Sequence, residues 1–178
     1  RDLVRSRGLG DVYKRQTLVR GKTIEAFTDA AKKTDRSFKA GAIAMGAKVE
    51  ISTLPGYLPT LAEEALPELK HAAEISASGI PVIEASGHAG GSTDVGDVQH
   101  LMPVYTFNTG GVKGGLHQID FEVTDEEEAY IVTAKMFALA AYGLLKEKAQ
   151  RSRELVDQYE PVFKNSAEYV EFLSLIHI

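Results

Sequence analysis

Histidine, aspartate and glycine gather in one stretch of this 178-residue chain, residues 86–121, which reads SGHAGGSTDVGDVQHLMPVYTFNTGGVKGGLHQIDF. Histidine and aspartate are the side chains most used for metal binding and proton transfer. Glycine allows the backbone to approach a ligand closely, because it lacks the Cβ atom that restricts other residues. These residue types predict that an active site, if the chain has one, lies in this stretch.

His117 is the first candidate, because it follows the glycine-rich run GVKGG and precedes the sequence that enters a long predicted helix. A histidine on a turn between a strand and a helix lies where α/β proteins bind ligands, at the ends of strands. The alternative is an ordinary surface-loop histidine, and spacing alone does not separate the two. His88 and His100 lack the i, i+4 spacing of a helical metal pair, so we interpret both as bystanders.

The segment STDVGDV allows two interpretations. Asp94 and Asp97 can cap a short helix, which is the commonest use of aspartate before a turn. Alternatively, Ser92, Thr93 and Asp94 present hydroxyls and a carboxylate to a ligand, while the amides of the preceding glycines face an anion. From the sequence alone, capping is the favoured interpretation.

Composition excludes several classes of protein. The sequence lacks HExxH, the phosphate-loop GxxxxGK[ST], GxSxG and a complete GxGxxG. Cysteine is absent, which excludes disulfides and thiolate metal sites and suits a reducing cytoplasm. The net charge of −5 argues against a binder of nucleic acid or anionic membranes, and no apolar run approaches the roughly 18 residues of a membrane span. A small-molecule or peptide ligand is the expected partner.

Both ends of the chain read as translated sequencing adapter. Residues 11–16, DVYKRQ, correspond to the codons of a transposase-end adapter, and residues 173–178, LSLIHI, correspond to its reverse complement. Such segments are set aside before the fold is considered. We therefore expect residues 1–16 and 173–178 to be non-native, and residues 17–172 to be an internal piece of a longer protein.

The hydrophobic pattern predicts an α/β fold, in which helices and strands alternate along the chain. The long helix is expected to begin with a capping box from Thr124 to Glu127. Because this helix is apolar around most of its circumference, it is expected to be largely buried against a sheet. The predicted helices are 23–46, 60–76, 125–148 and a short one at 153–159; Pro67 inside the second indicates either two shorter helices or a kink. The predicted strands are 17–20, 48–53, 80–84 and 104–109.

Several separated motifs, taken in order, resemble a known family. GGSTDVGDV, then a strand, a glycine turn, the pair LH and a DEEEAY helix are similar to the C-terminal half of the clan MH dinuclear metallopeptidases, which include aminoacylases and glutamate carboxypeptidases. STDVGDV is most similar to the aminobenzoyl-glutamate hydrolase type. Residues 17–53 resemble the end of that family's α+β dimerisation (lid) domain. Residues 54–172 resemble the C-terminal part of its catalytic domain, a sheet flanked by helices.

The resemblance implies a metal-dependent amidohydrolase that cleaves the amide bond of an N-acyl amino acid or an aminobenzoyl-glutamate-like substrate. It implies two divalent ions, zinc or manganese, and a homodimer. His117 matches the family's last metal ligand. The residues that match its substrate-binding positions are Arg20, on the VR strand, and Gly91, Ser92, Thr93 and Asp94, on the glycine-rich loop.

The family's other metal ligands and its base glutamate lie upstream, and no residue here matches them. One histidine cannot hold two metal ions, because a catalytic zinc ordinarily takes about three protein ligands. We therefore expect the full-length parent to be an enzyme and this chain to be inactive, with an unpaired sheet edge and exposed apolar surface. The alternative is a noncatalytic α/β binding or interaction module that uses the glycine-rich loop for an anionic ligand.

Overall fold

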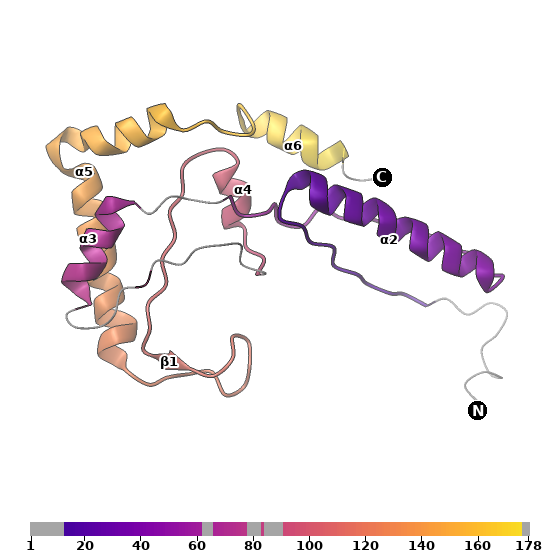
Figure 1. Ribbon diagram of the computed structural model, residues 1–178, viewed down its shortest axis with the longest axis horizontal. Helices are drawn as coiled ribbons and strands as arrows, with labels where there is room; N and C mark the ends of the chain where they lie inside the picture. Colours follow the sequence, from indigo (N-terminus) through magenta and orange to yellow (C-terminus); the bar gives the residue numbers. More distant parts are fainter. Residues whose placement is uncertain (1–12, 62–65, 78–82, 84–90, 176–178) are drawn as a thin grey trace. The chain divides into compact units, whose positions relative to one another are not determined.

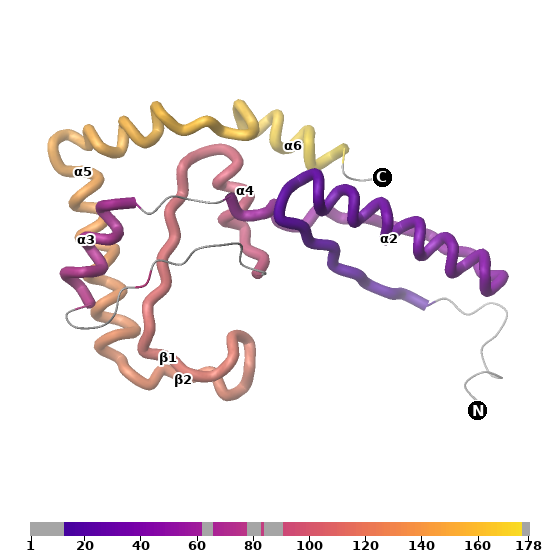
Figure 2. The backbone as a smooth tube through the Cα atoms, in the orientation of Figure 1, coloured from indigo at the N-terminus to yellow at the C-terminus, as the bar shows by residue number. Residues whose placement is uncertain are grey.

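The computed structural model describes residues 13–61, 66–77, 83 and 91–175 (Figure 1). The chain forms two compact units, Arg1–Ile51 and Ser52–Ile178. The first unit contains helix α2. The second contains α3 to α6, the π-helical segment η1 and a small sheet, whose backbone is traced in Figure 2.

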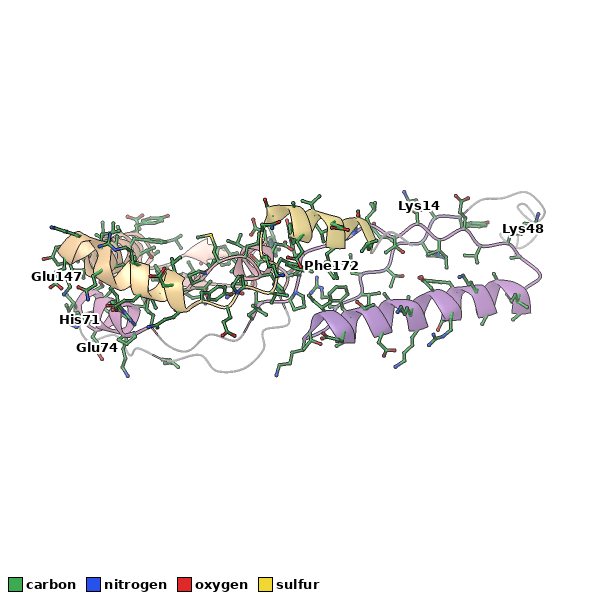
Figure 3. The ribbon with its side chains drawn as sticks, turned by 90° about the horizontal axis from the view of Figure 1, so that it is seen from above. Lys14, Lys48, His71, Glu74, Glu147 and Phe172 are labelled. Atoms are coloured by element: carbon green, nitrogen blue, oxygen red, sulfur yellow. The ribbon has the colours of Figure 1, made fainter. Side chains whose placement is uncertain are left out.

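Helix α2 spans Ile24–Ala44, and local capping fixes both of its ends. The Thr23 hydroxyl accepts a hydrogen bond from the N–H of Ala26 at 3.1 Å. After the helix, Gly46 has a φ of 63°, and the N–H of Ala47 donates to the carbonyl of Ala42 at 2.9 Å, which is a Schellman motif. The predicted helix 23–46 is therefore confirmed. No residue of α2 is buried, and side chains stand out along its length in Figure 3.

Helix α3 spans Pro67–Ser76 and begins at its proline. Leu66, just before it, has an extended backbone. Proline suits the first helical position, since its fixed φ is helical and an N–H there would have no intrahelical partner. Pro67 thus starts a helix, which fits the prediction of two shorter helices for the part after the proline and not the alternative of a kink. Residues 62–65, in the part before the proline, lie outside the described residues.

The long predicted helix begins as η1, Glu127–Val132, and continues as α5, Thr133–Gln158. The predicted capping box is wrong by one residue: the Asp125 carboxylate accepts a hydrogen bond from the N–H of Glu128 at 2.9 Å. Thr124 is held elsewhere, because its N–H donates to the carbonyl of Gly111 at 2.8 Å.

A break interrupts α5 at Lys146–Ala149, where Glu147, Lys148 and Ala149 have φ values of 53°, 60° and 59°. A left-handed conformation costs a non-glycine residue about 1–2 kcal/mol. The hydroxyl of Ser152 donates to the carbonyl of Leu144 at 2.8 Å and so satisfies one carbonyl freed by the break. The break falls where the predicted helix 125–148 ends, and the predicted short helix 153–159 forms the final part of α5.

Helix α3 packs against α5. The buried residues of η1 and α5 are Val132, Met136 and Ala140, which recur every four positions and so share one narrow stripe. The expectation that the long helix is largely buried against a sheet is wrong. Helix α3, whose buried residues are small, covers only that stripe of the long helix. The large apolar residues of η1 and α5 that are left exposed are Tyr130, Ile131, Phe137, Tyr142, Leu145 and Val156.

Strands β1, Val112–Lys113, and β2, Glu122–Val123, form an antiparallel pair with Val112 opposite Val123. It is the one sheet that the described residues contain. The predicted strands 17–20, 48–53 and 104–109 join no ladder there, and 80–84 lies outside the described residues except for Ile83. An alternating segment becomes a strand only when a neighbour supplies ladder hydrogen bonds.

Residues 104–109 contact the long helix instead of a strand. The ring of Phe107 lies 4.8 Å from that of Phe137, and the hydroxyls of Thr109 and Thr133 are 2.6 Å apart. These contacts explain why this apolar segment is extended without pairing. The α/β architecture of a larger protein stays a prediction.

The helical stretch Glu127–Gln158 has the length and composition of a membrane span, although the sequence analysis found no long apolar run. A core helix of a soluble protein can have the same length and apolar composition. Only 17% of its most apolar window is buried within the chain. The stretch therefore presents much of its apolar surface outward.

We expect Met136→Ala to lower the free energy of unfolding by about 2–4 kcal/mol, because the side chain is 5% exposed and its removal leaves a cavity. The control, Leu145→Ala, removes a side chain that is 62% exposed and should cost less than about 0.5 kcal/mol. Urea denaturation followed by circular dichroism measures both. An equal loss in the two variants would show that the outward face of α5 is covered in solution.

Candidate functional site

The loop Gly91–Asp94 leads directly into α4, which spans Val95–Gln99. Asp94 occupies the N-cap position, as predicted, but its side chain makes no capping hydrogen bond. The Thr93 hydroxyl replaces it by accepting from the N–H of Val95 at 3.4 Å and donating to Asp94 Oδ1 at 3.2 Å. Ser92 and Asp94 are exposed. The loop therefore offers a hydroxyl and a carboxylate to solvent, as the ligand interpretation requires.

Asp97 does not cap α4, in contrast to the capping interpretation. Its carboxylate accepts a hydrogen bond from the backbone N–H of Leu58 at 3.0 Å. Burial and the neighbouring Asp97 raise the pKa of Tyr169. Leu58 precedes Asp97 in the chain and Tyr169 follows it. Nothing local in the sequence indicates either contact, so sequence reasoning missed this role.

Gln99 and His100 are each only 2% exposed. Gln99 Oε1 accepts from the N–H of Leu61 at 3.0 Å. His100 Nδ1 lies 2.7 Å from the carbonyl oxygen of Gly96, and its ring lies 5.9 Å from that of Phe163. His100 is a buried packing residue here, which agrees with its interpretation as a bystander to metal chemistry. His88 lies outside the described residues.

Gly96 serves packing inside the protein. A Cβ atom at this position would lie 2.1 Å from the carbonyl oxygen of Leu58, far inside contact distance, whereas one at Gly91 would meet nothing within 4 Å. Gly96 is therefore required for α4 to approach the segment at Leu58. Gly91, in the candidate substrate loop, leaves space for a ligand.

His117 lies in the loop that joins β1 to β2. The sequence predicted a turn between a strand and a helix, but β2 intervenes before the helix. His117 is exposed and has a φ of 63°, a left-handed conformation that histidine adopts more readily than most residues. Among the described residues, no group of three or more His, Asp or Glu side chains is arranged to hold a metal ion. His117 thus presents an exposed imidazole that belongs to no group of metal ligands among the described residues.

Arg20, the remaining candidate, is exposed and belongs to the first unit. The loop Gly91–Asp94 and His117 belong to the second unit. Among the described residues, no hydrogen bond or ion pair joins the loop to His117.

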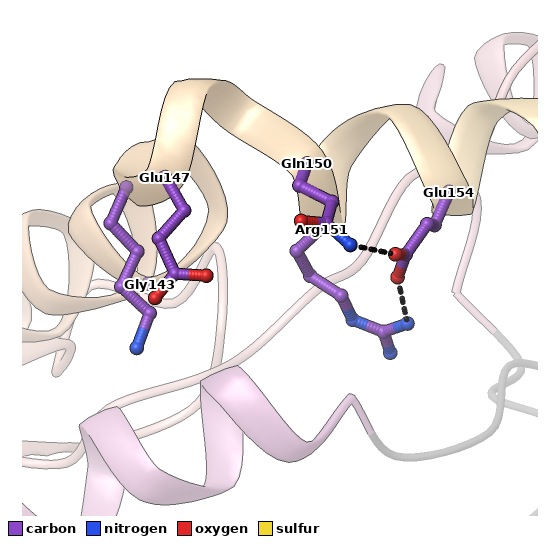
Figure 4. Close-up of a pocket in the computed structure, with 6 residues that line it drawn as sticks. Gly143, Glu147, Gln150, Arg151 and Glu154 are labelled. Carbon is purple, nitrogen blue, oxygen red and sulfur yellow. Dashed lines mark hydrogen bonds and ion pairs between the residues drawn. The ribbon is translucent and has the colours of Figure 1, made fainter.

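A charged cluster that sequence reasoning missed links α3 to the last part of α5. Arg151 Nε lies 2.8 Å from Glu68 Oε1, and Arg151 Nη1 lies 3.7 Å from Glu154 Oε2. Figure 4 shows Arg151 and Glu154 beside Gln150, which donates to Glu154 at 2.9 Å. Gln150, Arg151 and Glu154 line a cavity of about 200 Å³. Its other lining residues are Gly143, Lys146 and Glu147. Because Arg151 is paired with two carboxylates, we interpret the cluster as a structural link between helices.

Known proteins offer no match to the chain: no family model, no curated protein and no solved structure matches it. Any assignment of the chain to a class of protein therefore depends on its own residues.

Gly96→Ala is expected to destabilise the second unit by more than about 1 kcal/mol, because the added Cβ would overlap the Leu58 carbonyl and force the backbone to move. The matched variant Gly91→Ala should change the stability by less than about 0.5 kcal/mol, since its Cβ enters open space. Thermal unfolding of the two variants makes the comparison. Equal midpoints would rule out the close approach at Gly96.

Tyr169 gives the chain an expected response to alkali. Burial, together with the hydrogen bond to Asp97 and the negative charge of Asp97, raises the pKa of Tyr169 to about 12. A group whose pKa rises on folding stabilises the protein fully below its unfolded pKa, about 10 for tyrosine, and this stabilisation is lost as the pH rises through the folded value.

Tyr169→Phe should therefore reduce the fall in unfolding free energy between about pH 10 and pH 12. Tyr142→Phe is the matched control, because Tyr142 is 68% exposed. Urea denaturation at a series of pH values measures the slope for each protein. Identical slopes in the parent chain and in both variants would contradict the coupling between Tyr169 and Asp97.

Proposed function

We propose that this chain is the C-terminal part of a metal-dependent amidohydrolase of the clan MH type. Its expected substrate is an N-acyl amino acid or an aminobenzoyl-glutamate-like amide. The observation that carries the proposal is the order of GGSTDVGDV, LH and DEEEAY along one chain. In this proposal residues 17–53 end a dimerisation domain and residues 54–172 belong to a catalytic domain. The parent is a cytoplasmic homodimer, and residues 1–16 and 173–178 are translated adapter.

The exposure of the candidate groups supports a ligand-binding role for the loop. The Ser92 hydroxyl can donate a hydrogen bond to a substrate carboxylate or carbonyl, and the Asp94 carboxylate can accept one from an amide N–H. The Thr93 hydroxyl already lies 3.2 Å from Asp94 Oδ1, so these two side chains are oriented together before a ligand arrives.

The described residues do not by themselves complete a metal site, since they offer His117 without two or three further ligands. In the proposal, the other ligands and the base come from the part of the parent that precedes this chain. Zinc or manganese, when bound, would activate a water and polarise the substrate carbonyl. His117 would contribute an imidazole nitrogen, and its exposed position leaves that nitrogen accessible.

Recovery of the full-length gene allows a direct test. In the full-length parent, His117→Ala should lower bound zinc or manganese, measured by elemental analysis, and reduce hydrolysis of N-acyl amino acids by more than about 100-fold, because a direct ligand is lost. The matched control is His71→Ala, which removes an exposed histidine on α3 (Figure 3). It should leave the metal content and the rate unchanged.

Two results would contradict the proposal. An upstream reading frame without a cluster of histidine and acidic residues would leave the metal ions without ligands. Unchanged metal content and hydrolysis in His117→Ala would favour the noncatalytic module that binds an anionic ligand through the glycine-rich loop.

A further inference from the structure

Helix α4, which follows the candidate substrate loop, is tied to an earlier segment of the chain. The N–H of Leu58 donates to Asp97 and the N–H of Leu61 donates to Gln99, each at 3.0 Å. The absence of a side chain at Gly96 allows the two backbones to approach. These contacts span 39 and 38 residues of sequence.

The same short helix is also tied to the C-terminal part of the second unit. The N–H of Phe163 donates to the carbonyl of His100 at 3.0 Å. The Phe163 ring packs against those of Tyr169 and Phe172, at centroid distances of 5.7 Å and 5.2 Å. Burial and the neighbouring Asp97 raise the pKa of Tyr169 to about 12. Helix α4 is therefore held by the earlier segment through Asp97 and Gln99, and by the later segment through the carbonyl of His100.

Asp97 is also linked directly to the loop. Its backbone N–H donates to the carbonyl of Asp94 at 3.0 Å, and the N–H of Val98 donates to the same carbonyl at 3.3 Å. A displacement of Asp97 therefore moves the last residue of the loop. Hydrogen bonds to a carboxylate are stronger than those between neutral groups. The bond from Leu58 therefore fixes Asp97, and Asp97 fixes the end of the loop through its backbone N–H.

We propose that Asp97 is the positioning residue of the loop Gly91–Asp94, and that it acts by fixing the start of α4 to the backbone at Leu58 through its carboxylate. The positioning of the loop stands on these contacts alone. Its consequence for substrate binding rests on the proposed function. In this proposal Asp97 does not contact the substrate.

The first experiment uses the 178-residue chain and needs no activity. In Asp97→Ala, the amide of Leu58 should exchange its hydrogen roughly tenfold faster, because its acceptor is lost. The amides of Thr93 and Val95 should shift in the ¹⁵N–¹H spectrum. Asp97→Asn keeps an acceptor oxygen for Leu58 and should restore most of the protection. Asp157→Ala, an exposed aspartate on α5, is the matched control and should change none of these signals.

If Asp97→Ala fails to fold by circular dichroism, Tyr169→Phe provides the test. It keeps the ring on Phe163 and removes only the hydroxyl whose pKa is raised by burial and by Asp97. The expected result is a smaller shift of the Thr93 and Val95 amides with the helix content retained. Unchanged loop amides in Asp97→Ala, or in Tyr169→Phe where Asp97→Ala does not fold, would overturn the proposal.

The second experiment uses the full-length parent. Asp97→Ala should raise KM by roughly tenfold and leave kcat nearly unchanged, which is the effect of weakened substrate binding by about one hydrogen bond to a charged group. Metal content should stay at the parent level, unlike in His117→Ala. A parent that hydrolyses no amide while Asp97→Ala disturbs the loop would refute the function and support the positioning role. An unchanged KM with undisturbed loop amides would refute the positioning role alone.

Discussion

The hydrogen bond from the backbone of Leu58 to Asp97 is the interaction on which the arrangement around the candidate site depends. Helix α4 has five residues, and a helix this short is not stable by itself in water. It persists because segments on both sides of it in sequence supply partners for Asp97, Gln99 and His100. The loop that carries Ser92 and Thr93 leads directly into α4, so the same tertiary contacts fix its position.

Glycine has two separate uses in the chemistry-rich stretch. Some glycines leave open space beside a loop, as Gly91 does. Others allow backbone to meet backbone: Gly111 has a φ of 80°, and a Cβ atom there would lie 2.5 Å from the carbonyl oxygen of Asp125. The high glycine content therefore reflects packing of the hairpin against the start of the long helix as well as access for a ligand.

The sequence predicted best what local interactions decide. Helix α2 was predicted with both caps, because Thr23 and Gly46 act within one turn of its ends. Strands depend on distant partners, and the predicted strands 17–20, 48–53 and 104–109 join no ladder. The exposure of Asp94 and of His117 agreed with a candidate site, but the anchoring of Asp97 and the pair Glu68–Arg151, 83 residues apart, left no local signal.

The narrow buried stripe of the long helix has a thermodynamic consequence. The heat capacity change on unfolding grows with the apolar surface that becomes exposed, and so does the denaturant dependence of stability. Because Phe137, Tyr142 and Leu145 already face outward in the folded chain, they add little to either quantity. The second unit should therefore have a flatter stability curve with temperature than a domain of the same length with a full core. Covering that face would increase its curvature.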